Sequence, residues 1–141
     1  MAERDIYYKI RQASILENAY VISKIREFLS SDEYKQGLFD GTFNEINKLI
    51  GLVGSGGLFA LENYTGDNAI IREFIKLILA GTDVEIMAYM LIPKILYNDL
   101  TSVDFVKTVL LYEAVIMIYI GNFDGINYRE RIDYRLKSVF R

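Results

Sequence analysis

The 141-residue sequence contains no cysteine and no histidine, only one proline, and only two glutamines. Without thiols and imidazoles it cannot form disulfides, thiolate nucleophiles, histidine general bases or the common zinc sites. We therefore expect no catalytic site, no metal site and no cofactor. The lack of cysteine fits a reducing compartment, and the few glutamines beside many isoleucines and tyrosines favour a thermophile.

Long hydrophobic runs are also missing. The longest, residues 109–120, is interrupted by Glu113 and falls well short of the ~20 residues that span a bilayer. The first residues, MAERDIYYK, lack the apolar core of a secretory signal. We expect a cytoplasmic protein with no membrane contact. Because 52% of the residues are hydrophobic and the mean hydropathy is +0.16, part of the apolar surface should meet a partner.

Helical spacing dominates the chain, and no segment shows sustained strand alternation. We predict an all-α fold, a single compact helical bundle spanning residues 1–141 as one domain. Five main helices and a short basic C-terminal one follow from helix start and stop signals. These are capping boxes at Thr42 to Glu45 and Thr82 to Glu85, a helix start at Thr101 to Asp104, a cap at Asp67 and a terminal Gly81. The expected ranges are 3–29, from 42 onward, 68–80, 82–97, 101–121 and 127–140.

The first predicted helix is apolar on two sides. One stripe includes Ile6, Ile10 and Phe28, and the other includes Ile15 and Leu29. Such a helix is either central in a bundle, which we prefer, or carries a partner face.

Glycines cluster at residues 51–57, GLVGSGG. The context of a phosphate-binding loop is missing, because no strand precedes the cluster and no Lys-Ser/Thr pair follows it. We interpret the glycines as sites of close helix packing or as a break between two helices.

Glu113 is the carboxylate with the most apolar helical neighbours, such as Val109, Leu110, Ile116 and Met117. We predict a structural buried acid, paired with Arg72 or with a backbone donor. The alternative is a small helical enzyme that uses Glu113 as its acid.

Basic residues gather at both ends of the chain, among tyrosines such as Tyr7 and Tyr134. Residues 129–141 carry a local charge of +3 although the whole chain carries −3. This pattern suits a nucleic-acid backbone, and an ordinary solvated helix face explains it equally well. The candidate nucleic-acid-binding residues are Arg4, Lys9, Arg11, Arg129, Arg131, Arg135, Lys137 and Arg141.

Three stretches occur in a suggestive order and spacing: LENAYVISKI at 16–25, GLFAL at 57–61 and DFVKTVLLYEAVIMI at 104–118. Together they resemble the small subunit of the type III-B (Cmr) CRISPR effector complex, over about residues 10 to 120. The resemblance implies an all-helical, non-catalytic subunit that stacks along a ribonucleoprotein near guide RNA and target RNA. It adds Lys107 to the candidate RNA-binding residues.

The chain departs from the family pattern after residue 118. The family continues into a Trp and basic residues, whereas residues 118–123 here are apolar and the basic cluster comes later. Our hypothesis is a non-catalytic scaffold subunit of an RNA-guided complex in antiviral defence, which stacks on itself and on other subunits and helps to hold RNA. The alternative is a structural or adaptor bundle, viral or archaeal, that self-associates without nucleic acid.

Overall fold

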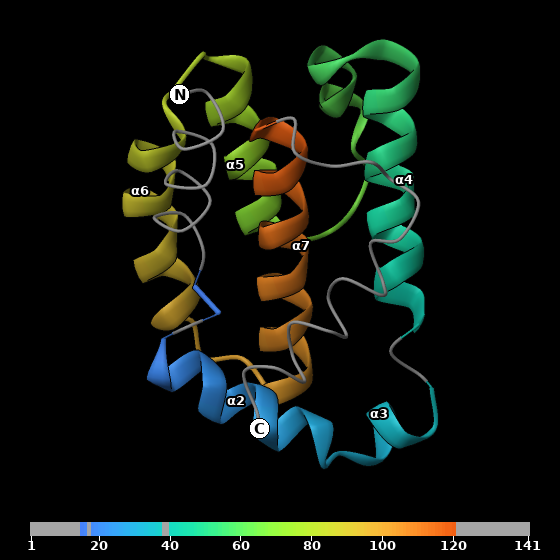
Figure 1. Cartoon of the computed structure of the whole chain (residues 1–141), viewed down its shortest axis with the longest axis vertical. Coiled ribbons are helices and arrows are strands. Elements are labelled where there is room, and N and C mark those ends of the chain that lie inside the picture. Colours follow the sequence, from blue (N-terminus) through green and yellow to red (C-terminus); the bar gives the residue numbers. More distant parts are fainter. Residues whose placement is uncertain (1–14, 17, 38–39, 121–141) are drawn as a thin grey trace, which may run out of the picture.

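The computed structural model describes residues 15–16, 18–37 and 40–120, which form the predicted all-α helical bundle with no strand among them. Figure 1 shows the arrangement, with α7 in the middle and α6 and α4 on either side. No helix of this described part is both long and apolar enough to cross a membrane. In chain order the helices are α2 (Ala19–Leu29), α3 (Asp32–Lys35), α4 (Asp40–Gly56), the 3-10 helix η1 (Leu58–Asn63), α5 (Ala69–Leu79), α6 (Val84–Leu96) and α7 (Ser102–Ile120).

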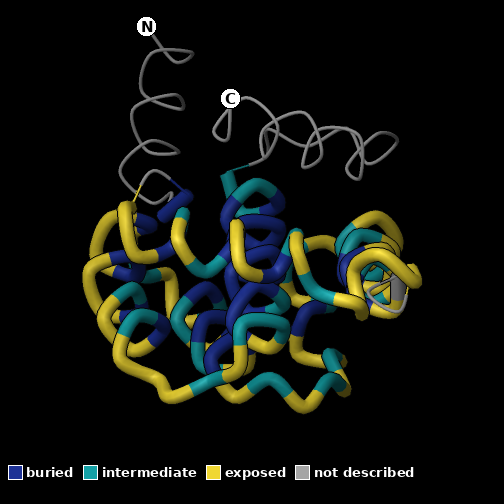
Figure 2. The backbone as a smooth tube through the Cα atoms, turned by 90° about the horizontal axis from the view of Figure 1, so that it is seen from below, coloured by how far each residue is buried: buried dark blue, intermediate teal, exposed yellow. Residues whose placement is uncertain are grey.

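Helix α7 is the centre of the bundle. Twelve of its nineteen residues are buried, because its sequence is apolar on every side after the first turn. Helices α2, α4, α5 and α6 all pack against it. Viewed from below in Figure 2, its buried turns lie in the middle of the molecule and the exposed turns of other helices lie around them.

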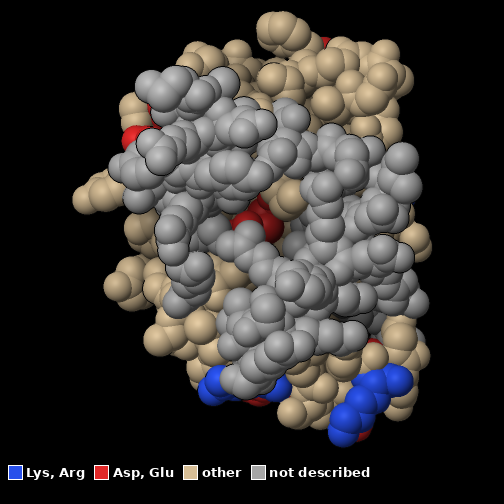
Figure 3. Space-filling view, viewed as in Figure 1, with Lys and Arg blue, Asp and Glu red and all other residues tan. Residues whose placement is uncertain are grey.

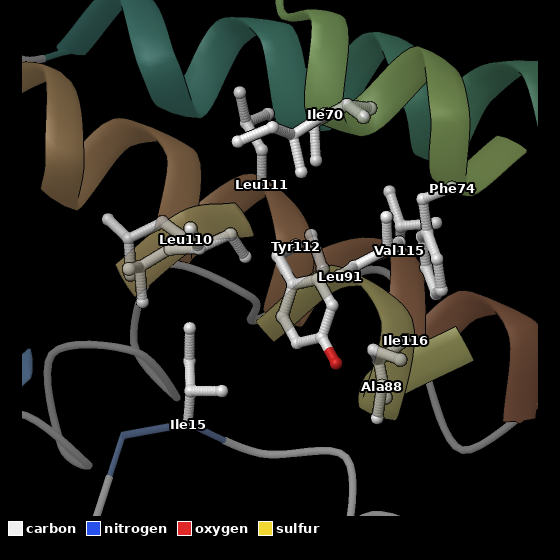
Figure 4. Close-up of a cluster of buried hydrophobic side chains, with 14 of the residues drawn as sticks. Ile15, Ile70, Phe74, Ala88, Leu91, Leu110, Leu111, Tyr112, Val115 and Ile116 are labelled. Carbon is white, nitrogen blue, oxygen red and sulfur yellow. The ribbon is translucent and has the colours of Figure 1, made fainter. Parts of the chain in front are cut away.

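Tyr112 of α7 lies in the core beside Phe74 of α5, with ring centroids 5.4 Å apart and planes tilted by 39°. Figure 4 shows Leu91 of α6 and Ile15, from the segment before α2, in the same cluster. Burial, followed by the neighbouring Glu113 carboxylate, raises the pKa of the Tyr112 phenol far above its ordinary value. Tyr112 is therefore a neutral core residue that joins three elements.

Two of the predicted helix ends are confirmed in atomic detail. At the end of α5, Gly81 adopts a φ of 77° and donates to Ile78 (2.9 Å), while Thr82 donates to Leu77 (3.1 Å). These two backbone hydrogen bonds form the Schellman motif, which ends a helix at a glycine in the left-handed conformation. At the start of α7, the Thr101 hydroxyl accepts from the Asp104 N–H (3.2 Å), so the helix starts where it was predicted.

Other predicted starts are wrong by one or two residues. Helix α4 begins at Asp40 instead of Thr42, which is buried inside the helix. Asn68 caps α5 in place of Asp67, and its side chain also reaches the Thr108 hydroxyl of α7 (3.1 Å). Asp83 caps α6 in place of Thr82. At α5 the side chain that caps the helix, Asn68, is thus also the one that contacts a neighbouring helix.

The predicted single helix over 3–29 is also wrong, because the chain is not helical at Ile15 and Leu16 and α2 starts after Asn18. The Asn18 side chain accepts from the N–H groups of Tyr20 and Val21, which begins a new helix there. Helix α2 buries one face, and the central position predicted for the first helix belongs to α7.

The glycine cluster does mark a break between helices. Gly57 has a φ of 72° and separates α4 from η1. Gly51 and Gly54 lie within α4 with open space around them, so the alternative of close helix packing is wrong for these two. The predicted C-terminal helix over 127–140 lies outside the described residues.

Candidate functional site

Helix α6 carries two apolar stripes with the same spacing. The first, residues 84, 87, 88, 91 and 95, faces the core, and all five side chains are buried. The second, residues 86, 89, 90 and 93 together with the C-cap residue 97, repeats the pattern two residues later. Since each residue turns an α-helix by about 100°, a shift of two residues moves the second stripe to the opposite side.

This second stripe faces away from the bundle. Tyr89 is 85% exposed, Tyr97 87% and Ile86 55%, and Met90 and Pro93 are exposed with them. Aromatic and Met side chains at the i, i+3, i+4 and i+7 positions are typical of a helix surface that binds another helix. We call residues 86, 89, 90, 93 and 97 the outer stripe.

A cavity of about 460 Å³ opens beside the outer stripe, lined by Glu85, Ala88, Tyr89, Ile92 and Pro93. Most of its walls are apolar, and it lies along one flank of the helix. The outer stripe thus offers both a ridge of large side chains and a hollow for a side chain of a partner.

Charge is sparse around this helix. On the described part of the face in Figure 3, Lys and Arg atoms lie along the lower edge, near α2 and α3. Acidic atoms show near the upper end of α6, in a gap at the middle of the face and beside the basic atoms of the lower edge. Within α6 itself the charged residues are Glu85 near the start and Lys94 near the end, and Asp83 caps the start. Lys94 contacts Glu73 of α5 and stays half exposed.

Among the predicted RNA-binding residues, Lys107 alone lies in the described part of the chain. It is half-buried in α7 and lines a cavity of about 600 Å³ that also contains Glu45, Asp67 and Asp104. Three carboxylates around one amine make this surface acidic and unfavourable for phosphate. The other eight candidates, Arg4, Lys9, Arg11, Arg129, Arg131, Arg135, Lys137 and Arg141, lie outside the described residues.

Glu113 is buried as predicted, with 1% exposure. Its Oε1 accepts a hydrogen bond from the backbone N–H of Ile15 (3.0 Å), which is one of the two partners that we expected. Arg72, the other expected partner, instead donates through Nε to the Gly66 carbonyl (2.8 Å) and lies 3.8 Å from Asp67. The carboxylate thus binds the segment before α2 to the central helix.

A second polar feature, which the sequence did not reveal, lies between α4 and the loop after η1. The Tyr64 hydroxyl donates to Glu45, and Gly66 lies directly over this pair, so that a methyl group on Gly66 would overlap both side chains. Burial, followed by the hydrogen bond to Glu45, raises the pKa of Tyr64 well above its ordinary value. The pair lines a cavity of about 770 Å³ whose remaining walls come mostly from α4.

The described body of the protein is acidic. Residues 15–16, 18–37 and 40–120 contain eight Lys and Arg against thirteen Asp and Glu, a balance of −5 for a chain whose total is −3. The basic excess therefore resides in the terminal stretches. Any surface of the body that binds a partner through charge should prefer a cation over a phosphate.

The outer stripe was not predicted, although its pattern is present in the sequence. Residues 84–97 contain the helical apolar spacing twice, with only Glu85 and Lys94 as charged residues. The two-sided apolar pattern predicted for residues 3–29 also occurs at residues 84–97, which form α6 and its C-cap.

Comparison with family models, curated proteins and solved structures finds no match for this chain.

Proposed function

We propose that this chain is a non-catalytic subunit that acts by binding other proteins within a larger assembly. The outer stripe of α6 carries the proposal, because it exposes Tyr89, Tyr97 and Ile86 together at helical spacing. Exposed apolar groups of this size cost solvation free energy in a lone monomer and are typical of interaction surfaces. Because α6 contains few charged residues, it favours the apolar surface of another protein over a highly charged partner such as RNA.

The assembly that we propose is the type III-B (Cmr) CRISPR effector complex, with this chain as its small subunit, acting in antiviral defence in the cytoplasm. Support comes from the three stretches that resemble that family. Two of them pack together here, since residues 18–25 belong to the capped start of α2, residues 104–118 form most of α7, and the two helices are in contact.

The charge distribution assigns RNA contact in this proposal to the terminal stretches. Because the described body carries a net charge of −5, RNA phosphates are best neutralised by the basic residues of 4–11 and 129–141. Contacts of this kind do not recognise the base sequence of the RNA. We leave Lys107 out of the proposed contacts because three carboxylates share its cavity.

The test is purification of the full chain from its native cells at low salt, followed by identification of bound proteins and RNA. RNA affinity of the complex is then measured against salt for the wild type and for a triple alanine variant of Arg129, Arg131 and Arg135. Loss of three phosphate contacts should lower the slope of log affinity against log salt by about 2. The matched control replaces Lys35, Lys48 and Lys76, three exposed lysines of the body, with alanine.

If the two triple variants weaken RNA binding equally, the terminal stretch has no special role. If the purified complex contains neither RNA nor effector subunits, the type III assignment is wrong. The second candidate, an adaptor bundle that binds proteins alone, is favoured by the acidic body and predicts protein partners without RNA.

A further inference from the structure

We infer that α6 pairs with the α6 of a second copy of this chain, antiparallel and across a two-fold axis beside Tyr89 and Met90. The inference deepens the proposed function and rests on it, because both require the outer stripe to bind protein. It names the partner as an identical helix and sets its direction and register.

The spacing of the outer stripe is self-complementary about this axis. With the axis between residues 89 and 90, Tyr89 of one copy lies at the level of Met90 of the other along the helix axis, and Ile86 lies at the level of Pro93. Every exposed apolar residue from 86 to 93 then has an apolar partner at the same level along the helix. A two-fold axis forms each of these contacts twice, so one short stripe forms a complete interface core.

The charges at the two ends of α6 agree with the same register. Asp83 and Lys94 are eleven residues apart, about three turns, and so lie on the same flank of the helix. An antiparallel partner places its Asp83 within two residues, about 3 Å along the axis, of Lys94 in the first copy. Two symmetric ion pairs result, and each extends the existing contact between Lys94 and Glu73. A parallel pair would instead set like charges at the same level.

The cavity beside Pro93 fits this arrangement. It is lined by Glu85, Ala88, Ile92 and by Tyr89 and Pro93 of the stripe, so its centre lies at the level of residues 89 and 90. Tyr89 of the second copy arrives at that level and on that flank, because an antiparallel two-fold pair brings equal flanks together. Each copy thus supplies a large aromatic side chain and a hollow of about 460 Å³ for the tyrosine of the other.

The test uses the full chain in sedimentation equilibrium over a range of concentrations. We expect a monomer–dimer equilibrium that Tyr89→Ser weakens about tenfold or more, as for a central aromatic at an interface. Phe59→Ser is the matched control, because Phe59 is also an exposed aromatic residue (73%) but lies on η1, away from α6. It should leave the dimer unchanged. Far-ultraviolet circular dichroism confirms that both variants remain folded.

Direction is tested by cross-linking, since the chain has no native cysteine. Met90→Cys lies next to the proposed axis and should cross-link to its own copy through a short bismaleimide. Tyr97→Cys should not, because antiparallel pairing sets the two copies of residue 97 about 22 Å apart along the axis. If both variants cross-link, the pair is parallel and the inference is wrong.

A wild-type chain that stays monomeric also overturns the inference. In that case the proposed function is tested by the proteins that purify with the chain from its native cells. If Tyr89→Ser loses the protein partners that wild type retains, the outer stripe binds a different protein and the proposed function holds. If the variant retains them all, the proposed function has lost its supporting observation as well.

Discussion

The backbone N–H of Ile15 donates a 3.0 Å hydrogen bond to Oε1 of Glu113, a residue 98 positions further along the chain. Both residues are buried, and Ile15 stands three residues before Asn18, the cap of α2. The bond therefore fixes the entry to α2 against the middle of α7. A carboxylate occurs in this apolar helix because a buried backbone donor requires an acceptor there.

Glu113→Leu removes that acceptor and leaves the Ile15 N–H unsatisfied. We expect a loss of about 1–3 kcal/mol in the free energy of unfolding, measured by urea denaturation. Glu113→Gln keeps an oxygen at the same position and should lose clearly less. Equal losses for the two variants would mean that the acceptor contributes nothing and that the loss has another origin.

Gly81 and Gly51 differ in backbone conformation, so we expect opposite changes in stability when each is replaced with alanine. Gly81→Ala places a Cβ on a left-handed residue (φ 77°) and should cost about 1 kcal/mol of stability. Gly51→Ala fills open space in the interior of α4 and should gain about 0.5–1 kcal/mol. Thermal and urea unfolding of the two variants measure the difference, and effects of the same sign would contradict the assignment of their conformations.

Gly66→Ala should destabilise the protein by about 1–2 kcal/mol, because the added methyl group overlaps the Tyr64 hydroxyl and the Glu45 carboxylate that it binds. The cost should fall by half or more when Tyr64 is first replaced with alanine. A double-mutant cycle by urea denaturation measures this coupling. Independent, additive losses would show that the methyl group clashes with something other than this pair.

Tyr112 predicts a specific weakness at high pH. Because burial raises the pKa of Tyr112 in the folded state, the folded chain holds the phenol proton more tightly than the unfolded chain does. The resulting stability is complete below the unfolded pKa of about 10 and is lost as the pH rises above it.

Tyr112→Phe should therefore lose less stability than wild type between about pH 9 and pH 11, measured by urea denaturation at each pH. Tyr97→Phe, which removes a hydroxyl from an exposed ring, is the control. Identical pH profiles for wild type and Tyr112→Phe would exclude this tyrosine as a source of the alkaline loss.

Much of the fold could be predicted from local sequence signals. Gly81 and the start at Thr101 were predicted correctly because the hydrogen bonds that define these helix ends form within a few residues. Thr42 matched a cap equally well, yet it lies in the core inside α4. Burial against other parts of the fold places Thr42 inside the helix, and the neighbouring residues in the sequence do not indicate this burial.

The candidate site was harder to predict. Glu113 was recognised from its apolar neighbours, but its donor, Ile15, is 98 residues away and no local pattern connects the two. The outer stripe of α6 has a clear pattern, although the pattern alone could not say which of its two stripes faces the core. Only the packing against α5 and α7 distinguishes Tyr89 from Leu91.

The central place of α7 has a consequence for synthesis on the ribosome. Four other helices rest on a helix that is translated after all of them, so α2, α4, α5 and α6 leave the exit tunnel before their common support exists. Their apolar faces then stay open to chaperones and to neighbouring nascent chains until residue 120 emerges. A ribosome that pauses within residues 102–120 would prolong that interval and the risk of aggregation.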